Sequence, residues 1–228
     1  VEGTKTSGTI TGDGQLVLKL YYTRNSYSYT IKYVEEGNET NILKTTTGEA
    51  KYEEEIDVTK ETFEGYTYVR QDKEKIKIDT TNNIATVYYT RNSYKVTYEY
   101  EGKVPTGASK TPAEATYKYG ASVTVAEDAT APGYTFSGWD HEDFPMPASD
   151  VVIKGHFTAN DNTQYKVEHY LEDLDGKAFT LKDTETLAGT TDTTATATPK
   201  QYPGFTYDST VEGTKTSGTI TGDGQLVL

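Results

Sequence analysis

The sequence has no cysteine, one methionine and one tryptophan, and only 34% of its residues are hydrophobic. Without cysteine, disulfide bonds and thiolate metal sites are excluded. No apolar run approaches the roughly 20 residues that a membrane-spanning helix needs, which argues against membrane insertion. Because large aliphatic side chains are so few, we expect several small cores in place of one large core.

Positive charge is also scarce, since 22 Lys and Arg residues stand against 35 Asp and Glu residues and give a formal net charge of −13. This balance argues against a nucleic-acid partner, because phosphates must be neutralised by Lys and Arg. Tyrosine, by contrast, is abundant, with 20 residues. Tyrosine and threonine favour strands, because aromatic and β-branched side chains suit a half-buried pleated surface.

One stretch occurs twice without substitution. Residues 1–18 read VEGTKTSGTITGDGQLVL, and residues 211–228 repeat that sequence in full. A fixed internal period indicates a repeat architecture. We therefore expect the chain to hold one period of a longer array, with an interrupted module at each end.

A shorter period lies inside the long one. YYTRNSY occupies residues 21–27 and 88–94, and a Gly-aromatic-Thr signal begins at Gly65, Gly133 and Gly204. Three copies of the same order of signals predict three modules. The predicted organisation is the C-terminal half of a preceding module at 1–24, module A at 25–91, module B at 92–160, and module C at 161–228, truncated in its last strand.

Each module reads as a series of short strands joined by turns, because apolar and polar residues alternate with period two. Residues 55–62 and 124–129 are compatible with one helical turn each, although helices this short are marginal. Residues 15–23 align with 82–90 and predict a closing strand. The predicted strands of module A are 28–35, 41–47, 64–70, 74–78 and 83–90.

Module B carries five motifs in a characteristic order. They are Tyr94–Tyr98, Tyr117–Gly120, Pro132–Trp139, Met146–Val151 and Phe157–Ala159. In this order and spacing they resemble the internalin-type B repeat. Modules A and C are similar to MucBP repeats, because each has a Tyr-x-Val/Ile-x-Tyr/His strand and a Gly-aromatic pair, and module A has a closing Tyr-Tyr-Thr.

The resemblance implies a fold and a location. It implies a mostly β (α+β) protein built from small β-grasp-like modules, each with a short helix or loop packed on a small sheet, in an elongated tandem array. It also implies an extracellular, cell-wall-attached surface protein of a Gram-positive bacterium. Such repeats commonly serve as stalk and adhesin segments.

The functional hypothesis is a structural and adhesive repeat segment that acts as a semi-rigid stalk or fibre. The alternative is a binding module for a host glycan such as mucin, or for a host protein. No nucleophile–base pair or paired carboxylates stand out, so we expect neither an enzyme nor a cofactor. The expected partners are adjacent identical repeats of the same or a neighbouring chain, with head-to-tail strand complementation of module C as one form.

Metal sites are not expected. His141, His156 and His169 lack the spacing of metal ligands, and the acidic clusters do not match a helix–loop–helix calcium loop. We interpret these clusters as solvated faces and hairpin tips. Calcium binding and Lys–Asn isopeptide crosslinks stay open at this point.

Aromatic residues are the candidates for contact and for core positions. Adjacent tyrosines point to opposite faces of a strand, so one of each Tyr-Tyr pair is expected to face outward or to meet a neighbouring module. The candidates for ligand or inter-module contact are Tyr21, Tyr22, Tyr88 and Tyr89. The predicted core anchors are Trp139, Tyr134, Tyr66 and Phe205.

Overall fold

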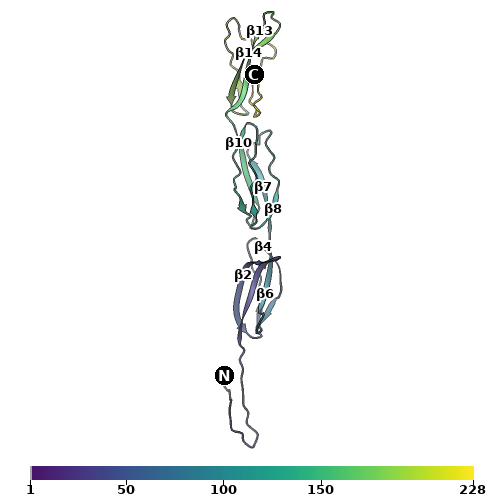
Figure 1. Ribbon diagram of the computed structural model, residues 1–228, viewed down its shortest axis with the longest axis vertical. Coiled ribbons are helices and arrows are strands. Elements are labelled where there is room, and N and C mark those ends of the chain that lie inside the picture. Colours follow the sequence, from purple (N-terminus) through teal and green to yellow (C-terminus); the bar gives the residue numbers. More distant parts are fainter. Residues whose placement is uncertain (1) are drawn as a thin grey trace. The chain divides into compact units, whose positions relative to one another are not determined.

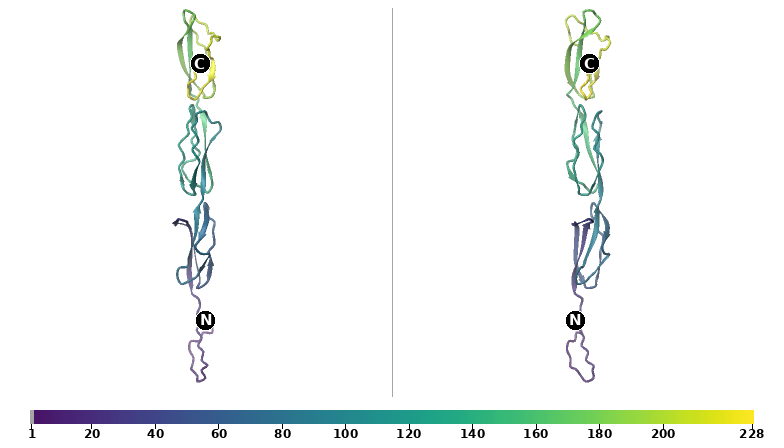
Figure 2. Two further views of the ribbon diagram at one scale, coloured as in Figure 1. Left: turned by 90° about the vertical axis from the view of Figure 1, so that its right-hand side faces the viewer. Right: turned by 45° about the vertical axis from the view of Figure 1, so that its right-hand side comes forward.

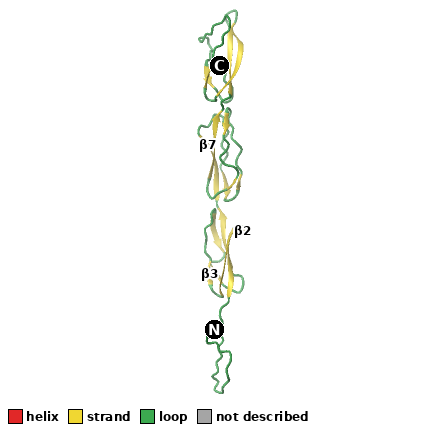
Figure 3. Ribbon diagram, turned by 90° about the vertical axis from the view of Figure 1, so that its left-hand side faces the viewer, coloured by secondary structure: helices red, strands yellow, loops and turns green. Residues whose placement is uncertain are grey.

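The computed structural model describes residues 2–228, which form strands, turns and loops (Figure 1). Within those residues there is no helix (Figure 3), so the prediction of a mostly β protein is confirmed. The residues group into two compact units, Val1–Asn92 and Ser93–Leu228. The names modules A, B and C are kept for the residue ranges given above, which remain predictions.

The first unit contains one four-stranded sheet and one short two-stranded sheet. Its strands are β1 (Ser26–Glu35), β2 (Asn38–Lys51), β3 (Glu55–Asp57), β4 (Tyr66–Gln71), β5 (Lys75–Lys77) and β6 (Ile84–Arg91). The order in the sheet is β2-β1-β6-β4, and β3 pairs with β5. The central strands β1 and β6 are parallel, with Thr30 beside Ile84, whereas β2 and β4 are antiparallel to their neighbours. All five predicted strands of module A are present.

The two helical turns considered for residues 55–62 and 124–129 are wrong. Glu55–Asp57 is strand β3, in which Ile56 lies opposite Ile76, and residues 124–129 have no regular structure. A helix of so few residues makes few internal hydrogen bonds. The β3–β5 pair instead satisfies backbone groups between two strands and packs Ile56 against the module A core.

Tyrosine side chains wall the core of module A. Tyr33 and Tyr89 are each 1% exposed. Phe63 lies between them, with ring centroids 5.7 Å from Tyr33 and 5.0 Å from Tyr89. The Tyr89 hydroxyl donates to the carbonyl oxygen of Glu61 at 2.8 Å and accepts from the Glu61 N–H at 2.9 Å, so its polar end is satisfied inside the module.

Residues 2–25 form a largely exposed loop in which Lys5 and Lys19 make an antiparallel bridge (Figure 2). A turn closes the tip of this loop, where the N–H of Gly14 donates to the carbonyl of Thr11. The predicted closing strand at 15–23 is not formed. The physical reason is the missing neighbour: β6, which has the corresponding sequence, is held between β1 and β4, and no such pair of strands flanks residues 15–23.

Module B repeats the sheet of module A. Its order β10-β12-β7-β8 matches β4-β6-β1-β2, with β7 and β12 parallel at the centre, and a short β9–β11 pair replaces the β3–β5 pair. Val96, Val123, Met146 and Ile153 form its core. The strands are β7 (Ser93–Glu101), β8 (Ala115–Lys118), β9 (Ser122–Val123), β10 (Tyr134–Phe136), β11 (Phe144–Pro145) and β12 (Val151–Ala159).

Module C contains two strand pairs, β13–β14 and β15–β16. Its last residues lie beside β13, where Val227 forms a parallel bridge with Lys166 (Figure 2, yellow beside green). Val167, Ile220, Leu226 and Leu228 belong to its core. The strands are β13 (Thr163–Glu172), β14 (Phe179–Gly189), β15 (Thr194–Thr196) and β16 (Ser217–Thr219). The β-grasp-like label stays a prediction.

Candidate functional site

The second unit joins modules B and C through a hydrogen-bonded junction centred on Gly133. The backbone of Gly133 has φ +74, a left-handed conformation that glycine adopts without strain. Its carbonyl oxygen accepts two hydrogen bonds, from the N–H of Asn160 at 2.9 Å and from Oγ1 of Thr191 at 2.8 Å. The Gly133 carbonyl of module B therefore binds Asn160, at the boundary between the modules, and the side chain of Thr191 in module C.

Thr191 is the buried element that module C contributes. It is 2% exposed, its N–H donates to the carbonyl of Asn160 at 2.9 Å, and its hydroxyl lies 2.6 Å from that of Thr163. A buried hydroxyl is stabilising only when it is hydrogen-bonded, and this one has partners in both modules. Thr191 therefore fixes the joint residue Asn160 against the start of β13.

The junction also brings two backbones into direct contact. A methyl group added to Gly222 would overlap the carbonyl oxygen of Pro132, and one added to Gly133 would lie 2.8 Å from Oγ1 of Thr191. Real side chains essentially never come so close. Only glycine at both positions allows the loop around Gly222 to rest on the Pro132–Gly133 turn.

Asp192 adds a charged contact beside the buried ones. Its Oδ2 is 2.6 Å from Nζ of Lys103 and accepts a 2.6 Å hydrogen bond from the Tyr134 hydroxyl. The Lys103 ammonium, followed by the Tyr134 hydroxyl, lowers the pKa of the Asp192 carboxyl. Because Lys103 is 73% and Asp192 41% exposed, water and salt screen this ion pair, and its contribution to stability is small.

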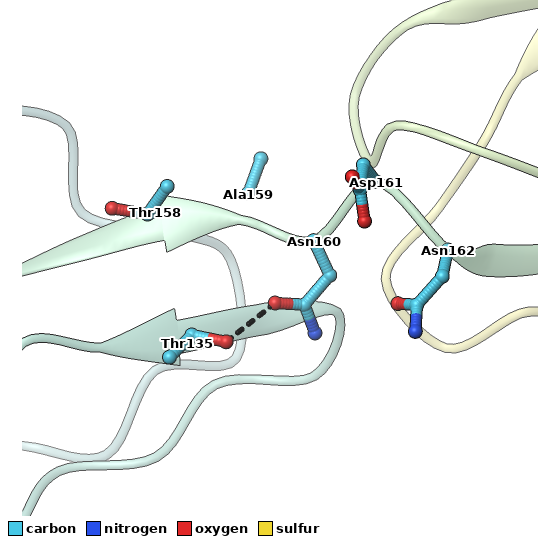
Figure 4. Close-up of a pocket in the computed structure, with 6 residues that line it drawn as sticks. All are labelled: Thr135, Thr158, Ala159, Asn160, Asp161 and Asn162. Carbon is cyan, nitrogen blue, oxygen red and sulfur yellow. Dashed lines mark hydrogen bonds between the residues drawn. The ribbon is translucent and has the colours of Figure 1, made fainter.

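The same chemistry explains the Gly-aromatic-Thr signal of the sequence. Oγ1 of Thr135 donates to Oδ1 of Asn160 at 2.7 Å (Figure 4), beside the Asn160 N–H bond to Gly133. In the first unit Thr67 and Asn92 make the equivalent 2.6 Å bond. In these two of the three signals, the glycine carbonyl and the threonine hydroxyl therefore bind one asparagine at the boundary between modules.

An open, polar hollow lies beside this joint, between Thr135, Asn160 and Asn162 (Figure 4). Across residues 2–228 there is no group of three or more His, Asp or Glu side chains placed to hold a metal ion. Over the same residues no helix is long and apolar enough to cross a membrane. The geometry of the junction attaches module C to module B.

Two family profiles match the chain. The MucBP domain matches residues 29–101 and 166–228, together more than half of the chain. The chain belongs to the MucBP domain family. The second profile, the Listeria-Bacteroides repeat domain, matches residues 94–152, within module B. The predicted relationship to repeats of Gram-positive surface proteins is confirmed. The chain is therefore an extracellular repeat segment of a surface protein.

Solved structures of two surface-protein repeats are similar to this MucBP chain. Streptococcal High Identity Repeats in Tandem (SHIRT) domains 3–4 from a cell surface protein are 16% identical with a TM-score of 0.22, over 57% of this chain and 96% of that one. The type 2 repeat of the mucus binding protein MUB from Lactobacillus reuteri is 14% identical with a TM-score of 0.23, over 58% and 99%. The comparison with curated proteins finds no match.

The four candidate contact tyrosines fall into two environments. Tyr21 and Tyr22 are 49% and 88% exposed in the loop before MucBP module A. In β6, Tyr88 and Tyr89 lie on opposite faces of the sheet. Tyr89 is buried, and the ring centre of Tyr88 lies 3.7 Å from Cζ of the Arg70 guanidinium. Whether any of the four binds a ligand stays a prediction.

The four predicted core anchors also differ in their surroundings. Trp139 packs in the module B core, 4.9 Å from the rings of Tyr98 and Phe136, and Tyr66 packs on the module A core. Tyr134 is half-buried and points its hydroxyl at Asp192. Phe205 is 46% exposed. Their role as anchors stays a prediction.

Sequence reasoning missed Thr191, Asp192 and Gly222, which make the junction. Thr191 and Asp192 sit in a Thr-rich run without a distinctive motif, and their partners in module B are far away in the sequence. Gly222 had a signal, since it lies in the duplicated stretch. That signal indicates a repeat period and not a contact, because the approach of Gly222 to Pro132 is a tertiary feature.

Acidification is expected to weaken the junction through Asp192. The lowered pKa means that the carboxylate contributes stability above the ordinary Asp value of about 3.9, and that this contribution is lost as pH falls through the lowered pKa. Amide hydrogen exchange of residues 189–193 should therefore rise modestly below about pH 4. In Asp192→Asn this rise in exchange at low pH should be absent. If the rise is unchanged in that variant, another titrating group causes it.

Proposed function

We propose that the chain is a semi-rigid stalk or fibre segment of a wall-attached bacterial surface protein, in which consecutive modules space a distal part away from the cell. The observation that carries the proposal is the junction between modules B and C. The backbones of the two modules touch there, and the buried Thr191 is hydrogen-bonded to Gly133 of module B and to Thr163 of module C. A spacer needs such fixed joints, because a flexible linker collapses to a length that grows only with the square root of its residues.

The proposal is tested by measuring the distance distribution between modules B and C. The chain has no cysteine, so spin labels attach only at introduced sites. Thr116 on β8 and Thr184 on β14 are exposed and suit this purpose. Double electron–electron resonance on the Thr116→Cys/Thr184→Cys chain should give one narrow distance distribution. A broad distribution, as a flexible tether produces, would count against a stalk.

A second candidate function is binding of a host glycan or protein. One observation favours it: Tyr170, Phe179 and Leu181 on β13 and β14 are 50%, 47% and 45% exposed. Register places Tyr170 opposite Leu181, with Phe179 two residues along the same strand, so the three share one face of the hairpin. Exposed aromatic residues of this kind are suited to stacking on sugars or packing on a protein.

Mucin pull-down and a glycan array test this second function. Binding should be lost on Tyr170→Ala/Phe179→Ala and kept on Val104→Ala, a control that removes a similarly exposed apolar side chain in module B. Absence of signal in both assays for the unmodified chain would argue against host binding and leave the spacer role unaffected.

A further inference from the structure

Each module has a tripeptide that begins four residues before the glycine of its Gly-aromatic-Thr signal. We call it the connecting tripeptide. It is Glu-Thr-Phe at 61–63 in module A, Ala-Thr-Ala at 129–131 in module B and Lys-Gln-Tyr at 200–202 in module C. Its first residue is therefore acidic in module A, uncharged in module B and basic in module C.

In module A the acidic residue of the tripeptide binds a basic residue of the second strand. Lys44 on β2 lies opposite Tyr33 of β1, and its Nζ is 2.7 Å from Oε1 of Glu61. The ring of Phe63, the last residue of the tripeptide, is 5.7 Å from that of Tyr33. The tripeptide is thus attached to β1 and β2 by one ion pair and one ring contact.

Module C has the opposite charge at the position of Lys44. Asp183 on β14 lies opposite His169 of β13. Lys44 and Tyr33 hold the same two positions in module A. The ring of Tyr202 is 6.1 Å from that of His169, so the tripeptide of module C occupies the equivalent place.

The basic residue of the module C tripeptide meets carboxylates on β14. Nζ of Lys200 is 3.4 Å from Oε2 of Glu185, and the Tyr202 hydroxyl donates to Oδ2 of Asp183 at 2.7 Å. The Tyr202 hydroxyl lowers the pKa of the Asp183 carboxyl. The His169 ring, followed by the Lys200 ammonium, lowers the pKa of the Glu185 carboxyl. Both carboxyls are therefore ionised at neutral pH, and this part of β14 is negatively charged.

Module B accepts neither charge at these positions. Ala129 and Ala131, the first and last residues of its tripeptide, are each 8% exposed. Larger side chains at buried alanine positions destabilise a module by overpacking. The three modules thus differ in both the charge and the size of the tripeptide that they hold.

We propose that these charges determine which connecting tripeptide each MucBP module accepts, so that modules A and C reject each other's tripeptide. Glu61 brought to module C would face Asp183 and Glu185. Lys200 brought to module A would face Lys44. Like charges on neighbouring elements destabilise a pairing, and discrimination between similar partners requires such a repulsive element.

The sheets alone do not distinguish the two modules. Tyr29 and Ile31 of β1 correspond to Tyr165 and Val167 of β13, which have similar shapes and no charge. Incorrect assembly between domains is a characteristic failure of repeat proteins. The proposed role concerns correct folding within each module, and it stands independently of the spacer function.

The attractive pairs contribute little stability by themselves. The side chains of the ion pairs Lys44–Glu61 and Lys200–Glu185 are partly exposed, and exposed ion pairs are weak. The discrimination comes from the difference between attraction in the correct module and repulsion in the other. A test must therefore compare an inverted charge with a removed charge.

Inversion of the charge in module C tests the proposal. Spin labels at Thr116→Cys and Gln201→Cys lie at exposed positions of one compact unit and report the position of the tripeptide. Lys200→Glu should broaden their distance distribution at least about twofold, because the new carboxylate faces Asp183 and Glu185. In about 1 M salt the distribution should narrow again, since the screening length falls to about 3 Å.

Two variants serve as controls. Lys200→Gln removes the charge without inverting it and should broaden the distribution less than Lys200→Glu does. The triple variant Asp183→Lys/Glu185→Thr/Lys200→Glu gives module C the three residues that module A has at these positions, and it should restore the narrow distribution. Lys200 is exposed, so its single variants keep the fold.

Each width is compared with that of labels at 116 and 184 in the same variant, so motion at the junction does not enter the comparison. Equal broadening in Lys200→Glu and Lys200→Gln would overturn the proposal. Broadening that is indifferent to salt, or a triple variant that stays broad while its 116–184 distance is narrow, would do the same. A broad 116–184 distribution in the chain without these substitutions would count against the spacer function alone.

Discussion

Gly222→Ala is expected to loosen the junction between modules B and C. The added methyl group would overlap the carbonyl oxygen of Pro132, a backbone atom that cannot move aside alone. The loop must therefore lift off the Pro132–Gly133 turn, and the bond from Thr191 to Gly133 is lost or stretched. Overpacking of this kind costs about 1–3 kcal/mol. The distance distribution between labels at 116 and 184 should broaden severalfold.

The duplicated stretch provides the matched control for this experiment. Gly12 occupies the same Thr-Gly-Asp-Gly sequence as Gly222, but a methyl group added to Gly12 meets nothing within 4 Å. Gly12→Ala should leave the B–C distance distribution unchanged. Equal broadening in both variants, or none in Gly222→Ala, would show that the glycine contact does not hold the junction.

Tyr89→Ala is expected to destabilise module A strongly, whereas Tyr88→Ala is not. Tyr89 is buried against Phe63, Tyr33 and Tyr68, and its hydroxyl makes two hydrogen bonds to the backbone of Glu61. Truncating a buried aromatic residue costs about 3–5 kcal/mol. A module of this size has a free energy of unfolding of roughly 3–10 kcal/mol, so about a third to all of it would be lost.

The neighbouring tyrosine serves as the control. Tyr88 lies on the opposite face of β6 and contacts the Arg70 guanidinium, so Tyr88→Ala should cost about 1 kcal/mol or less. Hydrogen exchange of residues 26–91 measures the stability of module A. The fluorescence of Trp139 monitors module B separately. Similar losses in the two variants would contradict the assignment of Tyr89 to the core.

The strands of module A were predictable because their signals are local. Alternation along 28–35 and 83–90 and the turn residues Gly37 and Asn82 identify the strands and their ends without knowledge of their partners. Which of Tyr88 and Tyr89 faces the core was not predictable from alternation alone. That choice depends on the pairing of β6 with β1 and β4, which is a property of the whole sheet.

The failed predictions share a cause. Residues 15–23 have the sequence of a strand but not the two neighbours that would hold one, and residues 55–57 form a strand because β5 pairs with them. The junction residues Thr191, Asp192 and Gly222 were missed for the same reason. Their importance comes from contacts with Gly133, Tyr134 and Pro132, and no local pattern encodes such contacts.

The parallel pairing at the centre of each complete sheet has a mechanical consequence. In module A the chain enters through β1 and leaves through β6, and these two strands lie side by side over six residue pairs. In module B the same holds for β7 and β12. Tension applied to the two ends of either module therefore acts along these strands, loading all the hydrogen bonds between them at once in shear. They must break together, whereas a hairpin pulled at its open end unzips one bond at a time.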